Sequence, residues 1–395
     1  MRVLFVTTFT YPHAGGLSTH ISMMVDYLPR LGHEAKVISF SNLSQLQQLR
    51  IRGISYLLNK MAKGRGIVYT NRARIGYLRR LVAAELKKGS YDLINAEDPA
   101  AMLAVAGLGL PVILTVHGYA TYEYISIGSV EAGSPAEKEL LALEGRAYRS
   151  ADALVAVDTR INRYLKENFD RDSVIIRNFV DLDRFKPELI DREKSRRELG
   201  IEKEAIVLFC PRRLTEKNGV IYPAMAMAIL REKYPQLRLY YAGDGEERPR
   251  LEQYIREKGL QDRVFLLGAV PHEKIREYYA AADIVLIPSV HAKGIEEATS
   301  IAAIEGMALE RPVVASAIGG LKELIEDGES GLLVEEKNPA ALAAAVSALI
   351  EDADLREKIA RGGRKRVEEH FSLDKGVQRY LEVYKEVLQK TRGAR

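Results

Sequence analysis

Short apolar runs alternate with longer segments of mixed apolar and polar residues along the whole chain. Apolar runs of this length, joined by helix-length segments, predict parallel sheets covered by helices on both faces. Because the runs form two series, the sequence predicts two doubly wound, Rossmann-like α/β domains that face each other across a cleft. The predicted strands are residues 2–8, 34–40, 93–95, 112–116, 153–157 and 174–176, then 205–209, 237–242, 264–266, 284–287 and 313–315.

A polar stretch, Asp181–Gly200, separates the two series, and a length of 395 residues is typical of two domains. We therefore expect an N-terminal domain over residues 1–183 and a C-terminal domain over residues 184–372. The pattern also predicts a last helix, and we expect residues 373–395 to return to the first domain and complete it.

The segment from Glu297 to Glu305 contains the most informative pattern in the chain. Glu297 precedes a predicted helix, Glu305 lies inside it, and Ser300 stands among small residues at its start. Backbone N–H groups at the start of a helix bind anions. The segment therefore predicts a phosphate site between two carboxylates, one suited to a ribose and the other to a transferred sugar.

The first predicted strand leads into a glycine-rich loop over residues 11–19, before a helix expected over 19–31. Gly15 and Gly16 in this loop permit close approach of the backbone to a phosphate or a sugar. A structural turn explains the same two glycines equally well. His117 ends the strand 112–116, where an imidazole would bond a sugar hydroxyl or stabilise a reacting centre, unless it is a structural histidine.

Two cations lie in the loop 210–218, before a helix expected over 219–233. Arg212 is suited to bind a diphosphate as a fork and Lys217 as a point charge. The alternative is that both are ordinary surface charges. Two further glycine turns, at Gly243 and at Gly319–Gly320, follow later strands and have the same ambiguity.

Several classes of function are not supported by the sequence. The chain has no P-loop, serine hydrolase or zinc protease motif and no carboxylate cluster with metal-ligand spacing, so we expect no metal and no cofactor. Cys210 is the only cysteine, which excludes an intrachain disulfide and fits a reducing compartment. The start of the sequence resembles a strand rather than a secretory leader, and we expect a cytoplasmic protein.

The net charge is only +4, but positive charge is concentrated in residues 41–88, which contain eleven Lys and Arg residues and one acid, Glu85. A cationic, partly amphipathic segment of this kind suggests peripheral contact with an anionic membrane or with an acidic acceptor. The alternative is a solvated face of a charge-rich protein. We expect no nucleic-acid partner, because no recognition motif accompanies the charge.

Taken together and in order, these residues resemble the family 4 retaining glycosyltransferases, which have the fold known as GT-B. The similarity covers nearly the whole chain, and its most specific part is the pair of acids with Arg311–Ala315 directly after it. The other matching segments are Gly15–Gly16 with His20, Leu31–Glu34, Val116–Gly118, Asn178 with Val180–Asp181 and Phe185, Arg212 with Lys217, Ala282–Asp283, Pro288–Ser289, and Gly319–Gly320 with Glu323. The chain departs from the family pattern at Pro211, Ala298 and Ser300, where glycine is common.

The resemblance implies a role for each candidate residue. Glu305 would hold the ribose and Glu297 would lie near the donor sugar, with His117 contacting that sugar. Arg212 and Lys217 would bind the diphosphate, together with Gly16 and the backbone N–H groups of Ser300, Ile301 and Ala302.

The function that the resemblance implies is retaining transfer of a sugar from a nucleotide diphosphate sugar to an acceptor hydroxyl. Uridine is the favoured base, and the acceptor is a sugar, a small molecule or a lipid-linked or anionic compound. Two alternatives remain open: a nucleotide-sugar 2-epimerase on a similar scaffold, and a non-catalytic nucleotide-sugar-binding subunit.

Overall fold

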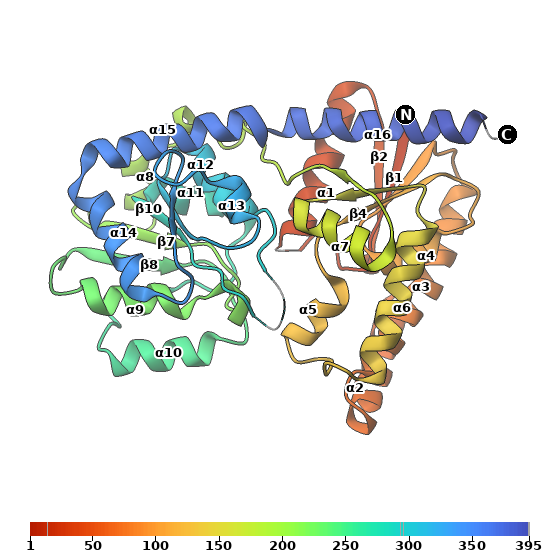
Figure 1. The fold of residues 1–395 in the computed structure, drawn as a ribbon, viewed down its shortest axis with the longest axis horizontal. Helices are drawn as coiled ribbons and strands as arrows, with labels where there is room; N and C mark the ends of the chain where they lie inside the picture. Colours follow the sequence, from red (N-terminus) through yellow and green to blue (C-terminus); the bar gives the residue numbers. More distant parts are fainter. Residues whose placement is uncertain (14, 293, 295, 394–395) are drawn as a thin grey trace. The chain divides into compact units, whose positions relative to one another are not determined.

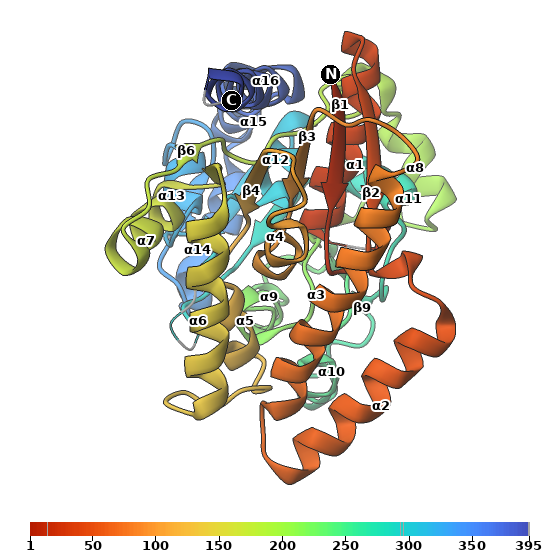
Figure 2. The same cartoon turned by 90° about the vertical axis from the view of Figure 1, so that its right-hand side faces the viewer.

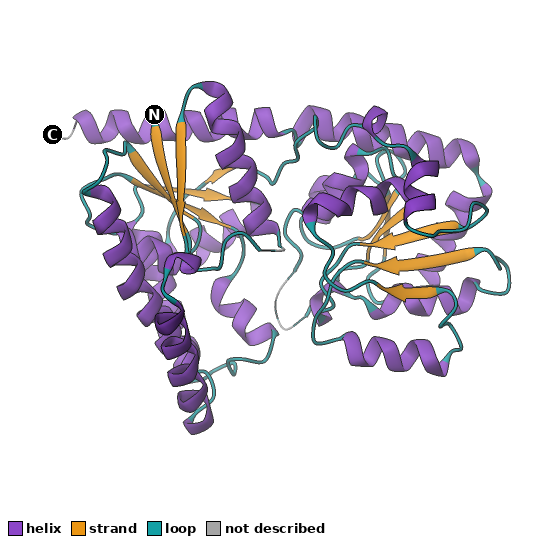
Figure 3. Cartoon of the chain, turned by 180° about the vertical axis from the view of Figure 1, so that it is seen from behind, coloured by secondary structure: helices purple, strands orange, loops and turns teal. Residues whose placement is uncertain are grey.

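The computed structural model describes residues 1–13, 15–292, 294 and 296–393. The chain forms two compact units, one of residues Met1–Arg177 with Asp374–Arg395 and the other of residues Asn178–Leu373. Each unit contains one six-stranded sheet in which all neighbouring strands run parallel. Figure 3 shows each sheet as a layer between helices, which confirms the predicted pair of doubly wound α/β folds.

The first sheet has the strand order β2-β1-β3-β4-β5-β6. Its strands are β1 (Arg2–Val6), β2 (Glu34–Ile38), β3 (Leu93–Ala96), β4 (Val112–Val116), β5 (Ala153–Ala156) and β6 (Val174–Ile175). The helices of the unit are α1 (Gly16–Tyr27), α2 (Gln45–Met61), α3 (Arg65–Leu86), α4 (Pro99–Val105), α5 (Ala120–Ser126), α6 (Pro135–Ser150), α7 (Thr159–Phe169) and α16 (Leu373–Gly393), with 3₁₀ turns η1 (Leu28–Leu31) and η2 (Phe40–Asn42).

The middle of the first sheet is buried on both faces, since every residue of β3 and β4 is buried. This explains why these strands are continuous apolar runs rather than alternating ones. The C-terminal helix α16 packs in this unit, where Tyr380 and Tyr384 are fully buried. Figure 2 shows α2 leaving the rest of the unit at its free end, while α3 runs back towards the sheet.

The second sheet has the strand order β12-β11-β10-β7-β8-β9. Its strands are β7 (Ile206–Cys210), β8 (Leu237–Tyr241), β9 (Val264–Leu266), β10 (Ile284–Ile287), β11 (Val313–Ser316) and β12 (Leu332–Val334). The helices are α8 (Arg192–Glu198), α9 (Ile221–Leu230), α10 (Arg248–Glu257), α11 (His272–Ala281), α12 (Ile301–Ala308), α13 (Leu321–Leu324), α14 (Pro339–Glu351) and α15 (Ala353–His370), with 3₁₀ turns η3 (Pro187–Leu189) and η4 (Glu216–Asn218).

The second sheet separates two hydrophobic cores, and successive residues of one strand enter opposite cores. Val207 and Phe209 of β7 pack in one core with α12, whereas Leu208 and Cys210 pack in the other with α9 and α14. This alternation follows from the two-residue period of a strand.

The structure corrects several of the predicted boundaries. The first helix begins at Gly16 rather than at residue 19, and the predicted glycine-rich loop 11–19 is therefore shorter. The helix expected over 219–233 is α9, preceded by the turn η4. Strand β12 was not predicted, although other three-residue apolar runs, such as 264–266, were. No helix in the described part of the chain is long and apolar enough to cross a membrane.

Candidate functional site

The second sheet has a switch point between β7 and β10, which are neighbours although they are far apart in sequence. At such a point the loops after the two strands leave in opposite directions and open a crevice at the carboxyl edge, where doubly wound sheets bind their ligands. Arg212 follows β7 by two residues, and Ser289 follows β10 by two residues. The strand order thus brings two loops with polar residues together.

Arg212 is the centre of a buried polar cluster at this edge. Its Nη1 donates to Ser300 Oγ at 3.1 Å, and Nη2 lies 2.5 Å from Asn218 Oδ1, 3.0 Å from Ser289 Oγ and 2.6 Å from Glu297 Oε2. Arg212 is 9% exposed. Among the described residues its Nε–H is buried and has no acceptor. A buried guanidinium with a donor to spare is suited to bind an additional anion.

Glu297 faces this guanidinium and is held in its charged form. Burial opposes ionisation of the carboxyl, but the charge and hydrogen bond of Arg212 outweigh it, with help from the charge of Lys217 and a hydrogen bond from Ser289, so the pKa of Glu297 lies below its ordinary value. The structure thus brings three predicted residues, Glu297, Arg212 and Ser300, into one network.

Glu305 lies inside α12 and Glu297 lies before it, as the sequence predicts. Glu305 is 5% exposed, and its Oε2 lies 3.0 Å from the hydroxyl of Tyr279, whose oxygen is also 2.9 Å from the carbonyl of Ala302. Burial raises the pKa of Tyr279 well above its ordinary value, and the Glu305 carboxylate adds to this effect. Tyr279 therefore remains a neutral hydroxyl beside Glu305.

The start of α12 is capped by its own serine. Ser300 Oγ accepts from the N–H of Ala303 at 3.4 Å and also accepts from Arg212. Ile301 and Ala302 are the first two residues of the helix, so their N–H groups belong to the set that lacks partners within a helix. The three residues predicted to contact phosphate are therefore adjacent at one helix end, and Arg212 is hydrogen-bonded to the first of them.

The glycine turns predicted from the sequence hold this site together by close backbone contact. A Cβ at Gly320 would lie 2.7 Å from the carbonyl carbon of Ala298 and from the nitrogen of Thr299, and a Cβ at Gly243 would lie 2.1 Å from the carbonyl oxygen of Arg212. Gly320 also donates its N–H to the carbonyl of Glu297 at 2.9 Å. These glycines position the two loops through backbone packing.

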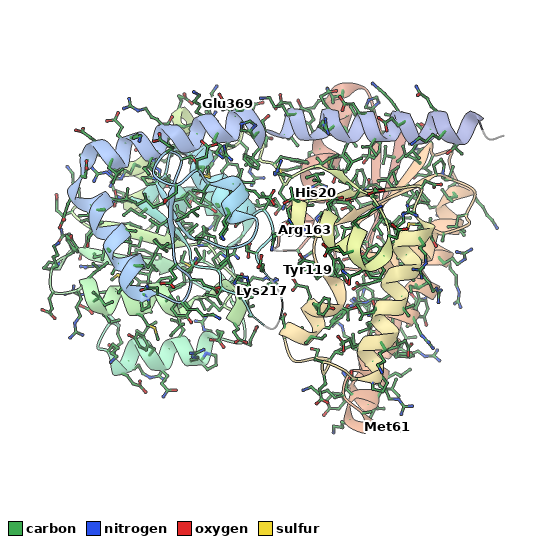
Figure 4. All side chains as sticks on the ribbon, viewed as in Figure 1. His20, Met61, Tyr119, Arg163, Lys217 and Glu369 are labelled. Carbon is green, nitrogen blue, oxygen red and sulfur yellow. The ribbon has the colours of Figure 1, made fainter. Side chains whose placement is uncertain are left out.

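Lys217 lies in η4, and its carbonyl accepts from the N–H of Val290, which joins the loop after β7 to the loop after β10. Figure 4 marks its side chain at the edge of the second unit, on the loops at the carboxyl ends of the strands. Its charge also contributes to the lowered pKa of Glu297.

In the first unit, His117 follows β4 and forms a pair with a carboxylate that the sequence analysis did not single out. His117 Nε2 lies 2.7 Å from Oε2 of Glu97, which is fully buried after β3. The ring of His20, from α1, lies 5.0 Å from the ring of His117. Burial lowers the pKa of His20 well below its ordinary value, and the charge of His117 lowers it further, so His20 is neutral.

A chain of buried hydrogen bonds connects this pair to the C-terminal helix. Asn95 Nδ2 donates to Glu97 Oε1 at 2.5 Å and to Thr115 Oγ1 at 3.0 Å, and Tyr384 of α16 donates to Asn95 Oδ1 at 3.0 Å. Burial raises the pKa of Glu97, although the hydrogen bond and charge of His117 oppose the shift. The orientation of His117 is therefore fixed by groups that extend to α16.

Within the described residues, His20, Glu97 and His117 are also a group with the spacing of metal ligands, since their ligand atoms lie within 4.8 Å of one another. Two imidazoles and a carboxylate are a donor set that suits zinc. The expectation that the protein needs no metal therefore remains a prediction, and these three residues are the place to test it. Gly15 caps α1 and Gly16 is the first residue of this helix, which also carries His20; their neighbour Ala14 lies outside the described residues.

The switch point of the first sheet, between β1 and β3, contains a pocket whose lining includes Thr8, Phe9, Asp98, Tyr124 and Glu144. Asp98 accepts from the N–H of Thr8 at 2.7 Å and caps α4, so this carboxylate has a structural role. Phe9 is 39% exposed and gives the pocket an apolar wall. The pocket therefore combines an aromatic surface with positioned oxygen atoms.

The sequence analysis missed Glu97, Tyr279, Asn218 and Ser289 as site residues. Glu97 carried a usable signal, since it directly follows a buried strand, as His117 does, and neighbouring parallel strands end at the same edge. Tyr279 carried none, because it lies on a helix beside a second tyrosine, Tyr278, and in no distinguishing motif.

The chain is similar in sequence to known glycosyltransferases. The model of glycosyltransferase family 4 matches residues 14–184, and the model of glycosyl transferases group 1 matches residues 191–366. A D-inositol 3-phosphate glycosyltransferase of Geodermatophilus obscurus is 30% identical over 76% of this chain and 68% of its own length. An uncharacterized glycosyltransferase of Methanocaldococcus jannaschii is 28% identical over 98% of both chains.

The fold is similar to that of solved glycosyltransferase structures. Sucrose-phosphate synthase from Thermosynechococcus elongatus superposes with a TM-score of 0.78 at 20% identity, over 98% of this chain and 99% of the other. Anabaena HepE in complex with UDP-glucose superposes with a TM-score of 0.74 at 22% identity, over 98% of this chain and all of the other.

Proposed function

Since the chain belongs to the family 4 glycosyltransferases, enzymes that transfer sugars, we propose that it moves a sugar from a nucleotide diphosphate sugar to an acceptor hydroxyl with retention of configuration at C1. The observation that carries the proposal is the network of Arg212, Glu297 and Ser300 at the switch point of the second sheet. This network places a cation, a carboxylate and a helix start where such sheets bind ligands.

In the proposed reaction the bond between C1 of the sugar and the diphosphate oxygen breaks, and a bond from C1 to the acceptor oxygen forms on the same face. The acceptor proton passes to an oxygen of the leaving diphosphate. Arg212, through Nε–H, and Lys217 stabilise the negative charge that develops there, and the N–H groups of Ser300, Ile301 and Ala302 assist. Glu297 offsets the positive charge on the sugar, and Glu305 binds the ribose.

We propose that His117, in the first unit, is a donor to a sugar hydroxyl. Its bond to Glu97 fixes the ring, so the other nitrogen keeps one orientation. We propose that Gly15 and Gly16, at the start of α1, bind phosphate. We assign the acceptor to the pocket of the first unit at Phe9 and Asp98, since it lies at the switch point of that sheet.

Uridine is the base that we propose, and the UDP-glucose complex of HepE, a protein of similar fold, is consistent with it. We propose lipid-linked or anionic compounds as acceptors, and peripheral contact of residues 41–88 with an anionic membrane. The positive charge of that segment supports both parts of this proposal.

A thermal-shift panel of UDP-, GDP- and ADP-sugars tests donor binding, because a ligand of the native state raises its melting temperature. We expect a shift with UDP-sugars that is lost in Glu305→Ala. A product analysis by NMR then reports the anomeric configuration. Inversion at C1 would overturn the retaining mechanism, and an epimerised nucleotide sugar formed without acceptor would favour the epimerase.

A further inference from the structure

The helix α2 exposes a cluster of large apolar side chains that no other described element matches. Nine large hydrophobic residues are exposed in the described part of the chain, and five of them lie on this one helix. They are Leu46, Leu49, Tyr56, Leu57 and Met61, with exposures between 60% and 78%. Surface apolar residues normally occur singly, and a group of this size on one element indicates a binding surface.

The five side chains form one face of the helix. At 100° per residue they fall within an arc of roughly 140°, which Arg50 and Lys60 share. Ile51, on the opposite side, is 1% exposed and anchors the helix to the unit. Ser55 and Asn59, also on the anchored side, hydrogen-bond the backbone of Gly66 in α3 at 2.9 Å and 2.8 Å. The fold therefore holds α2 in place and presents its apolar face outwards, with Met61 at the far end in Figure 4.

The same helix is cationic. It carries Arg50, Arg52 and Lys60 and no acidic residue. Within the described residues neither Arg50 nor Arg52 has a carboxylate partner, while Lys60 lies 4.7 Å above the ring of Tyr56. The acids that approach this region are Glu131, 3.6 Å from Lys63, and Glu139, which pairs with Arg72 of α3. Positive charge therefore remains in excess on this face, with Arg50 and Lys60 between its apolar residues and Arg52 at its border.

We propose that α2 is an interfacial helix that inserts its apolar face into an anionic bilayer, with its Arg and Lys residues at the level of the phosphates. This inference rests on the proposed membrane contact of residues 41–88 and adds insertion by a defined face. The charge decides between occupants: a symmetric pair of two α2 helices would bring like charges together, whereas anionic lipid is complementary to them. Arg50 and Lys60 lie among the apolar residues, and long cationic side chains on interfacial helices reach the phosphates while their stems lie along apolar surface.

The chain contains no tryptophan, so one introduced indole reports on insertion without background. We would compare Leu49→Trp with Ile229→Trp, a control at an exposed apolar position of α9 in the second unit. The probes are vesicles of phosphatidylcholine alone and of phosphatidylcholine with an equal amount of phosphatidylglycerol. We expect a blue shift of emission for Leu49→Trp with the anionic vesicles only, and no shift for the control.

Cosedimentation with the same vesicles measures affinity. We expect the triple variant Leu46→Gln, Leu49→Gln, Leu57→Gln to lose at least about tenfold in binding at low salt, because it removes apolar surface that insertion buries. The matched control is Leu189→Gln with Ile229→Gln, which changes exposed apolar residues elsewhere and should bind as the unchanged protein does. Circular dichroism confirms that each variant is folded.

Three results would overturn the inference. Binding without a fluorescence shift would leave an electrostatic contact and remove insertion, and absence of binding would remove both. A change of molar mass in light scattering that the triple variant abolishes would assign the face to a second copy of the chain. Donor-induced thermal shifts are measured on every variant, and because they depend on the second unit they separate failure of this inference from failure of the proposed transferase site.

Discussion

The ion pair between Arg212 and Glu297 permits a quantitative test of the site. Both side chains are nearly buried, at 9% and 13% exposure, and their closest atoms are 2.6 Å apart. Arg212→Met keeps most of the volume but removes the cation that is hydrogen-bonded to the carboxylate, which retains the hydrogen bond from Ser289 and the more distant charge of Lys217. Breaking a buried pair in this way costs about 3–5 kcal/mol, because the remaining charge loses its hydrogen-bonded partner. At about 2–4 °C per kcal/mol for a unit of this size, the melting temperature should fall by roughly 6–20 °C.

Glu297→Gln should cost much less, since an amide oxygen can still accept from Arg212. The change replaces a charge-assisted hydrogen bond by a neutral one, a loss of about 1–2 kcal/mol. In the double variant with Arg212→Met the uncompensated charge is removed, and the combined loss should be smaller than the sum by about 1–3 kcal/mol. Calorimetry or urea titration of the four proteins measures this coupling.

The pH dependence of the folding stability tests the same ion pair independently. The folded-state pKa of Glu297 lies below its ordinary value of 4.5. The stability that its ionised form contributes is therefore complete above the unfolded-state pKa and is lost as the pH falls through the folded-state pKa. Wild type should lose stability on acidification below pH 4.5 more steeply than Glu297→Gln. Additive single losses, or parallel pH curves, would refute the reasoning.

Three further predictions concern the same two units. Gly320→Ala should destabilise the protein by about 1–3 kcal/mol and weaken donor binding, because the new Cβ meets the backbone between the two acids; Gly76→Ala, in open space on α3, is the control. Glu97→Gln should lower turnover more than donor affinity, and should become more stable relative to wild type as the pH rises above the ordinary carboxyl value of 4.5, because burial raises the pKa of Glu97 and its charge opposes folding. Incubation with EDTA should leave turnover unchanged; a loss restored by zinc would assign a metal to His20, Glu97 and His117.

The sequence predicted the two sheets because their inner strands are buried on both faces and are therefore continuous apolar runs. It did not predict β12, an edge strand of three partly buried residues, although runs of the same length were predicted elsewhere. It also placed the start of α1 too late, because glycine commonly marks a loop, whereas here Gly16 begins the helix.

For the site, the sequence could identify residues that follow strands but not the contacts among them. Arg212 and Glu297 were assigned to opposite ends of the donor, one at the diphosphate and one at the sugar. The structure pairs them directly, since the neighbouring positions of β7 and β10 bring their loops together. Sequence spacing of 85 residues carries no information about that contact, because it depends on strand order. For the same reason the bond between Glu97 and His117 was not anticipated, although both residues follow adjacent strands.

The ion pair of Arg212 and Glu297 bears on the proposed catalysis. While Arg212 is bound to Glu297, the carboxylate remains ionised and fixed, which is the state that stabilisation of a positively charged sugar requires. In the proposed reaction the guanidinium would bind the diphosphate through Nε–H without releasing the carboxylate, since that buried donor has no acceptor within the described residues. One arginine would then couple the leaving group to the group that stabilises the sugar. Arg212→Lys, which keeps the charge but has no second donor edge, should therefore lower turnover by more than it lowers donor affinity. Equal losses in both quantities would show that Arg212 serves binding alone.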